Sequence, residues 1–258
     1  MVLLVSDMHF GRGPEERDRA IEKALLDCLE HHLEELGELV LLGDVFDHYI
    51  EYEHLVPKGA ARLKGRLAEW SANGLAVSYL VGNHDPWHRD YFTRTLGVDV
   101  TDGSIRKRLG EHRALLAHGD GLAPSNWIYN ELKPALRHPL LVGLYRSLLP
   151  ADFGIRLARW WSRRHDRPEV RPEIAEDLRR RASSTLEESD TDLVVFAHSH
   201  RAELQRHADG TYVNTGSWRR DRTYVLVDGP AVQLLRWNGN EPSLVEQCGD
   251  PTRSGDSS

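Results

Sequence analysis

Short apolar runs alternate with segments of helical spacing through the first third of the chain, which predicts an α/β fold built from βαβ units. Each run stops at a polar residue or a glycine, as buried strands do. A chain of 258 residues with 40% hydrophobic and 28% charged residues has an ordinary globular composition. It is long enough to bury a sizeable core, so disorder of the whole chain is excluded.

The strands and helices of the first part of the chain follow from these patterns in order. Buried strands are expected at residues 2–5, 39–42, 77–81, 114–117 and 193–197. Helices are expected at 15–36, 58–72 and 88–96. The first is the clearest, because it places Ile21, Leu25, Leu29 and Leu33 four residues apart on one face.

The second half of the chain has a different pattern. Residues at about 121–190 lack strand patterns and look helical, with prolines at 134, 139, 150, 168 and 172 that break them into short helices. We expect a helical insertion, the lid, between two strands. The β-rich segments 211–214, 223–227 and 232–235 predict a closing meander. Residues 1–248 are then one domain, and 249–258 are a disordered tail.

Composition also limits the cellular setting and the partners. No apolar run approaches the length of a membrane span, and the first residues lack the basic start of a signal peptide. Two cysteines, Cys28 and Cys248, cannot form a disulfide framework, which fits a reducing cytoplasm. The net charge of −7 argues against a nucleic-acid partner. No protein partner is inferred.

Polar residues follow all five expected strands. Each motif alone is more often a surface pair or a turn, but their order along the chain is hard to attribute to chance. Ligands of open α/β sheets bind beyond the carboxyl ends of strands, so these side chains are expected to converge. They are Asp7, His9, Asp44, Asn83, His84, His118, His198 and His200.

The residue types in this set favour a two-metal site. Carboxylate and amide oxygens mixed with imidazoles suit Mn, Fe, Zn, Co or Ni better than calcium. Without His84, the set has seven ligands, which are too many for one tetrahedral zinc. They suit two metals bridged by a shared carboxylate. Two-metal sites clamp the attacking and leaving oxygens in phosphoryl transfer.

Five motifs together resemble the signature of the calcineurin-like metallophosphoesterases over about residues 1–240. The resemblance implies a four-layer fold, with two mixed sheets packed face to face and helices outside. The motifs are Ser6-Asp7-Met8-His9, Gly43-Asp44-Val45-Phe46-Asp47, Gly82-Asn83-His84-Asp85, His118-Gly119-Asp120 and Ala197-His198-Ser199-His200. Ala197 stands where the family usually has glycine, a change of one methyl group that we expect to be tolerated.

The same resemblance implies a role for each residue. One metal would be held by Asp7, His9, Asp44 and His200, and the other by Asp44, Asn83, His118 and His198. Asp44 would bridge both metals, and a metal-bridging hydroxide would attack phosphorus. His84 would stabilise charge on the phosphoryl or leaving oxygen, oriented by Asp85, and Asp47 would orient a ligand. Mn²⁺ is the metal expected.

Within this family the chain resembles UDP-2,3-diacylglucosamine diphosphatases, most closely the Bacteroidetes type. Residues 41–47, 118–121, 214–218, 51–59 and the helical insertion carry this likeness. It implies cleavage of the pyrophosphate bond of a nucleotide-linked diacyl sugar, releasing UMP and 2,3-diacylglucosamine 1-phosphate in lipid A synthesis. Well-known members carry arginine where this chain has His84, which is the commoner residue across the superfamily.

The lid is basic and apolar at once. Between residues 131 and 165 the acids are Glu131 and Asp152, and the basic residues are Lys133, Arg137, Arg146, Arg156, Arg159, Arg163 and Arg164. Basic amphipathic helices with tryptophan favour membrane surfaces. We therefore expect a cytoplasmic protein that lies peripherally on the cytoplasmic face of the inner membrane. The alternative is a helical hairpin that only covers an exposed sheet edge.

Substrate contacts can be suggested for a few residues. Arg156 and Arg159 are candidates for phosphate or glucosamine, because a guanidinium pairs with phosphate oxygens in bidentate fashion. Both could equally be solvated or face a membrane. Asn126 is a candidate for the sugar or nucleotide.

Three other functions stay open at this point. The chain could hydrolyse another phosphodiester substrate, or serve as a non-catalytic scaffold of the same fold. It could also be a nucleic-acid exonuclease, which the acidic net charge disfavours.

Overall fold

Strands β1 (Val2–Val5) and β2 (Glu38–Leu42) are apolar at nearly every position because both faces of their sheet are buried. Leu3 packs with the helices on one side, and Leu4 packs against the second sheet on the other side. In this computed structural model, residues 1–164 and 172–248 are described, with the backbone only for Ala158, Arg159 and 161–164. The tail expected at 249–258 lies outside the described residues.

The first sheet is mixed and has seven strands in the order β12-β11-β10-β1-β2-β3-β4. Strands β1 to β4 run parallel, and β10 to β12 are antiparallel to their neighbours. The further strands are β3 (Ala76–Leu80), β4 (Asp99–Thr101), β10 (Thr223–Asp228), β11 (Ala231–Trp237) and β12 (Pro242–Cys248).

The second sheet has five strands in the order β5-β6-β7-β9-β8. The three central strands are parallel, and β5 and β8 pair antiparallel at the edges. The strands are β5 (Ile105–Leu109), β6 (His112–Leu116), β7 (Leu193–Phe196), β8 (Glu203–His207) and β9 (Gly210–Asn214). The predicted meander is therefore wrong for one of its three strands. The strand at 211–214 pairs with β7, and the meander consists of β10, β11 and β12.

Three apolar clusters show how the layers are stacked. Helices α1 (Glu15–His32) and α2 (Ala61–Ala72) pack on the outer face of the seven-stranded sheet. The inner faces of the two sheets meet through residues such as Val40 and Val195. Helix α6 (Pro172–Glu188) covers the five-stranded sheet. The order helix, sheet, sheet, helix confirms the predicted four-layer fold.

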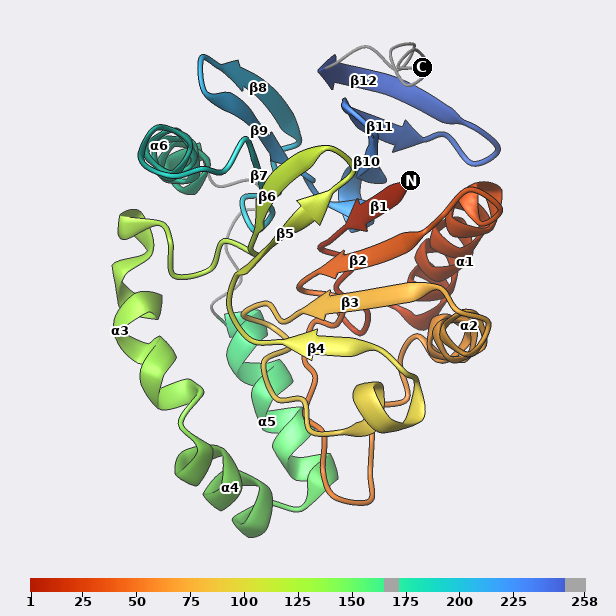
Figure 1. The fold of residues 1–258 in the computed structure, drawn as a ribbon. Helices are drawn as coiled ribbons and strands as arrows, with labels where there is room; N and C mark the ends of the chain where they lie inside the picture. The colour runs from red at the N-terminus through yellow and green to blue at the C-terminus, as the bar shows by residue number, and fades with distance from the viewer. Residues whose placement is uncertain (165–171, 249–258) are drawn as a thin grey trace.

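In the described part of the chain between β6 and β7, the regular elements are all helices. They are η2 (Pro124–Asn126), α3 (Trp127–Leu136), α4 (Pro139–Leu148), α5 (Ala151–Arg164) and α6; the short η1 (Tyr91–Thr95) and α7 (Trp218–Asp221) lie elsewhere. Figure 1 shows α3 on the side toward which the arrowheads of β2, β3 and β4 point, with α4 and α5 below the edge of the sheet that β4 forms. Within the described ranges, no helix combines the length and apolar character needed to cross a membrane.

Candidate metal centre

The candidate ligands come from both sheets. Asp7 and His9 follow β1, Asp44 follows β2 and Asn83 follows β3, all in the seven-stranded sheet. From the five-stranded sheet, His118 follows β6, while His198 and His200 follow β7. The parallel strands deliver their carboxyl ends to one place, which brings together residues up to 193 positions apart in the chain.

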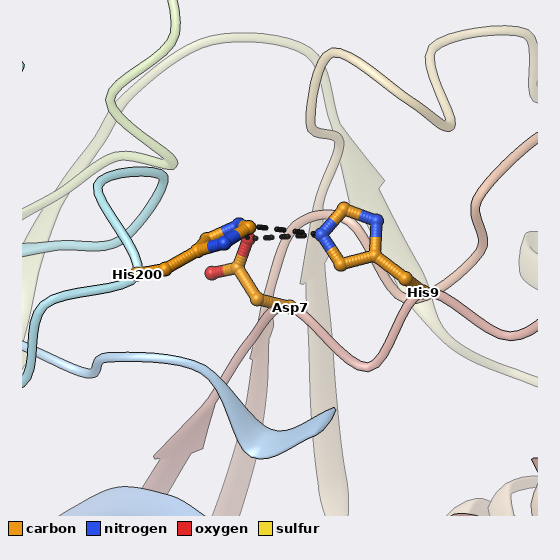
Figure 2. Close-up of side chains that lie close together, drawn as sticks. All are labelled: Asp7, His9 and His200. Atoms are coloured by element: carbon orange, nitrogen blue, oxygen red, sulfur yellow. Dashed lines mark hydrogen bonds and ion pairs between the residues drawn. The ribbon is translucent and has the colours of Figure 1, made fainter. Parts of the chain in front are cut away.

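Asp7, His9 and His200 form the first group. Nε2 of His200 lies 2.9 Å from Oδ1 of Asp7 and 3.3 Å from Nε2 of His9. Nε2 of His9 lies 3.5 Å from the same Asp7 oxygen. Figure 2 shows the two imidazoles and the carboxylate pointing toward one another. Three ligand atoms of the kinds that divalent metals accept therefore converge.

Asp44 links the other groups. One group consists of Asp44, His118 and His198, and another of His9, Asp44 and His84. Oδ2 of Asp44 lies 3.3 Å from Nε2 of His118 and 3.8 Å from Nε2 of His9. Nδ1 of His118 lies 2.8 Å from the carbonyl oxygen of Leu42, and by donating to it leaves Nε2 free to act as a ligand. Asp44 is thus placed to be shared.

The donor set fits a pair of divalent cations. Asn83 Oδ1 is buried and has no hydrogen-bond partner within the described part of the chain, and the neighbours of Asp7 Oδ1 and His118 Nε2 are other candidate ligands. Burial would raise the pKa of Asp7, but His200 beside it lowers that pKa well below the ordinary value. Burial would also raise the pKa of Asp44, but the neighbouring His118 and His84 lower that pKa well below the ordinary value. Ionised carboxylates and imidazole side chains together are good ligands for divalent cations.

The backbone at the centre is unusual. Among the described residues seven non-glycine residues have φ in the left-handed region, and five of them are candidate ligands: Asp7, His9, Asp44, His198 and His200. This region is disfavoured for residues with a Cβ and is common at functional sites. Ala197 does not share this conformation and packs between the sheets, so its methyl group is accommodated as expected.

One of the predicted roles, that of Asp85 in orienting His84, has different contacts in the structure. Asp85 accepts hydrogen bonds from the backbone N–H groups of Gly82 and Val45, at 2.8 and 2.7 Å, and from Tyr79. The carboxylate of Asp85 therefore joins the loop after β2 to the loop after β3. The ring of His84 contacts Asp47 instead, with Nδ1 3.1 Å from the carbonyl oxygen of Asp47. Asp47 Oδ1 lies 3.7 Å from Nδ1 of His9, and its role in orienting a ligand stays a prediction.

The suggested substrate residues all belong to the helical insertion. Asn126 is half-buried at the start of α3, and its backbone N–H donates to Ala123. Arg156 is exposed on α5. The side chain of Arg159 is outside the described residues. Their substrate contacts therefore remain predictions.

Arg219 is a residue that the sequence patterns did not single out. Its Nη1 donates to the carbonyl oxygen of His9 at 3.1 Å and to Asp18 Oδ1 at 2.8 Å. Ser217 donates to the carbonyl oxygen of Asp7 at 3.2 Å. These contacts support the first ligand loop from about 210 residues away in the chain, and the only signal in the sequence was the family likeness of residues 214–218.

Comparisons with known proteins agree with this geometry. The chain is 27% identical over 251 residues to UDP-2,3-diacylglucosamine hydrolase of Porphyromonas gingivalis, covering 90% of this chain and 96% of that one. The enzyme of that name from Pseudomonas fluorescens is 27% identical over 253 residues, covering 95% and 98%. The solved structure of Yfce, a phosphoesterase from E. coli, aligns with a TM-score of 0.51 and 17% identity, covering 96% and 97%, and supports the fold alone.

A family-level comparison covers most of the chain. A sequence model of the calcineurin-like phosphoesterases matches residues 1–202, a range that contains every candidate ligand. The match, the four-layer fold and the convergent carboxylates and imidazoles agree with one another. This chain belongs to the calcineurin-like phosphoesterase family.

Proposed function

We propose that this protein hydrolyses the pyrophosphate bond of UDP-2,3-diacylglucosamine, giving UMP and 2,3-diacylglucosamine 1-phosphate. The observation that carries the proposal is the position of an apolar helical surface on the side where the strands of the metal centre end. A phosphoesterase that acts on a soluble diester has no need of such a surface. The curated relatives of P. gingivalis and P. fluorescens carry the name of this activity.

The apolar surface is concentrated on three helices. Among the described residues, eleven of fifteen exposed large apolar side chains belong to α3, α4 and α5. They are Trp127, Ile128, Leu132, Leu136, Leu140, Leu141, Leu144, Leu148, Phe153, Leu157 and Trp160. A patch of this extent marks a binding surface for apolar partners. Two acyl chains and the surface of a membrane are partners of that chemistry.

In the proposed centre Asp7, His9, Asp44 and His200 would hold one divalent cation, and Asp44, Asn83, His118 and His198 would hold the other. Bound cations polarise a phosphoryl oxygen and lower the pKa of water. Asp44 contributes the shared negative charge between them. His84, whose Nδ1 lies 3.1 Å from the carbonyl oxygen of Asp47, is the residue that we propose to stabilise charge on the phosphoryl or leaving oxygen. Mn²⁺ is the cation we propose, because the ligands mix oxygen and nitrogen.

Product analysis tests the reaction. With Mn²⁺ and UDP-2,3-diacylglucosamine, mass spectrometry is expected to find UMP and the diacyl sugar phosphate in equal amounts. An Asp44→Asn variant, matched in protein concentration, is expected to release neither. Turnover of a generic aryl phosphodiester without release of UMP from the lipid substrate would keep the hydrolase and reject the substrate.

We further propose that the apolar surface contacts the inner membrane from its cytoplasmic face. Leu140 and Leu148 are 77% and 68% exposed on α4. Burying a leucine contributes about 1.5–3 kcal/mol, so replacing both by serine should weaken binding to anionic vesicles at least about tenfold. Hydrolysis of a soluble diester should not change. Leu244→Ser on the edge strand β12, where the side chain is 56% exposed, is the matched control. Equal vesicle binding by all variants would reject membrane contact.

A further inference from the structure

One face of helix α3 is directed at a single carboxylate. Tyr129, Lys133 and Arg137 lie four residues apart, and each contacts Asp120, which follows His118 by two positions. Oδ2 of Asp120 lies 2.8 Å from the hydroxyl of Tyr129, 2.8 Å from Nζ of Lys133 and 2.9 Å from Nη2 of Arg137. Asp120 is buried, so these contacts fix the loop that carries His118.

Arg137 reaches farther than the other two. Its Nη2 also donates to the carbonyl oxygen of Gly82 at 3.1 Å, and its Nη1 pairs with the carboxylate of Asp102. The guanidinium is only 12% exposed. It therefore joins the loop after β6 to the loops after β3 and β4, which belong to the other sheet.

The partner of Arg137 in the first sheet is adjacent to the metal centre. Gly82 precedes Asn83 and packs so closely on Asp44 that a Cβ there would overlap the Asp44 carboxylate. Fixing the carbonyl of Gly82 thus fixes the positions of Asn83 and Asp44 relative to His118. These are three of the four ligands proposed for the second cation.

Another face of α3 is apolar and exposed. Ile128 and Leu132, four residues apart on that face, are 46% and 48% exposed. The same helix therefore offers an apolar surface on one side and holds the ligand loops on the other. Arg137, at its carboxyl end, connects the two.

We propose that Arg137 is a positioning residue that fixes the loop of Asn83 relative to the loop of His118. Through Arg137, helix α3 becomes part of the second cation site. This inference rests on the proposed metal centre. Residues that support metal ligands in this way change metal affinity by about 10–100-fold when they are replaced.

Calorimetric titration with Mn²⁺ tests the inference on the whole chain. Arg137→Gln is expected to bind one Mn²⁺ like the wild type and the other about 10–100-fold more weakly. Arg137→Lys keeps the positive charge but lacks the planar guanidinium that donates to both Gly82 and Asp120. Its affinity for the second Mn²⁺ is therefore expected to lie between those of the wild type and Arg137→Gln. Arg179→Gln is the control, because Arg179 pairs with Glu203 of β8 at 2.9 Å and with Glu176 of its own helix, and neither residue is a candidate ligand. Its two affinities should match the wild type.

Hydrolysis of a soluble diester gives a second readout. At low Mn²⁺ the kcat of Arg137→Gln should fall, and saturating Mn²⁺ should restore most of it without a change in KM. Wild-type affinity for both ions in Arg137→Gln, or in Arg137→Lys if the glutamine variant does not fold, would overturn the inference. Failure of the wild type to bind Mn²⁺ through Asp44 would instead overturn the proposed function.

Discussion

Replacement of Asp44 by asparagine is expected to lower turnover by about 10³-fold or more and to leave the fold intact. The substitution removes the negative charge that the two proposed cations share. Asparagine has the same shape, and its side-chain oxygen can still accept the hydrogen bond that the backbone N–H of His84 donates to Oδ1 at 2.9 Å. The loss therefore falls on the chemistry and not on the packing.

Initial rates with an aryl phosphodiester, together with metal analysis and thermal unfolding, measure this effect. Asp90→Asn is the control, because Asp90 is 53% exposed and pairs with Arg94 on the surface. Turnover close to the wild type, with two ions bound per chain, would show that Asp44 is not the shared ligand.

Replacement of Gly82 by alanine is the second change with a large expected effect. The new Cβ would overlap Oδ1 of Asp44 and lie 2.6 Å from the Asp44 backbone nitrogen, a separation that the backbone cannot tolerate. The Asp44 and Asn83 loops must move apart. Overpacking of this kind costs about 1–3 kcal/mol of stability, and a shift of about 1 Å at a reacting centre lowers the rate about 10²-fold.

Another glycine serves as the matched control. Gly65 lies on the exposed face of α2 with no atom within 4 Å of a Cβ placed there. Gly65→Ala should stabilise the fold by about 0.5–1 kcal/mol, because alanine is the better helix former, and should leave the rate unchanged. If Gly82→Ala gave wild-type rates and metal affinity, the close packing at Asp44 would not matter for activity.

Much of the centre could be predicted from sequence because its ligands follow buried strands. The runs before Asp7, Asp44 and His118 are apolar at every position, so both the strand and its end are visible. The prolines were also informative at helix starts, since Pro139 and Pro172 open α4 and α6. Pro134 was misleading, because it lies inside α3 without ending it.

The features that could not be predicted from the sequence are those that depend on tertiary contacts. Strand β12 exposes Leu244, Val245 and Glu246 in succession, so it has no alternating pattern to reveal it. Arg137 and Gly82 are 55 residues apart, and nothing local relates them. The spacing of Tyr129, Lys133 and Arg137 does indicate a polar helix face, but only the fold shows that Asp120 lies opposite it.

The left-handed backbone at the five candidate ligands has a consequence for the amount of folded protein. This conformation costs an L-residue about 1–2 kcal/mol, and glycine would avoid that cost but has no side chain to bind a cation. Selection for activity has therefore kept a less stable backbone at these positions. A cation that binds only the folded chain restores stability in proportion to the logarithm of its concentration. The abundance of this enzyme in a cell should accordingly follow the supply of its metal.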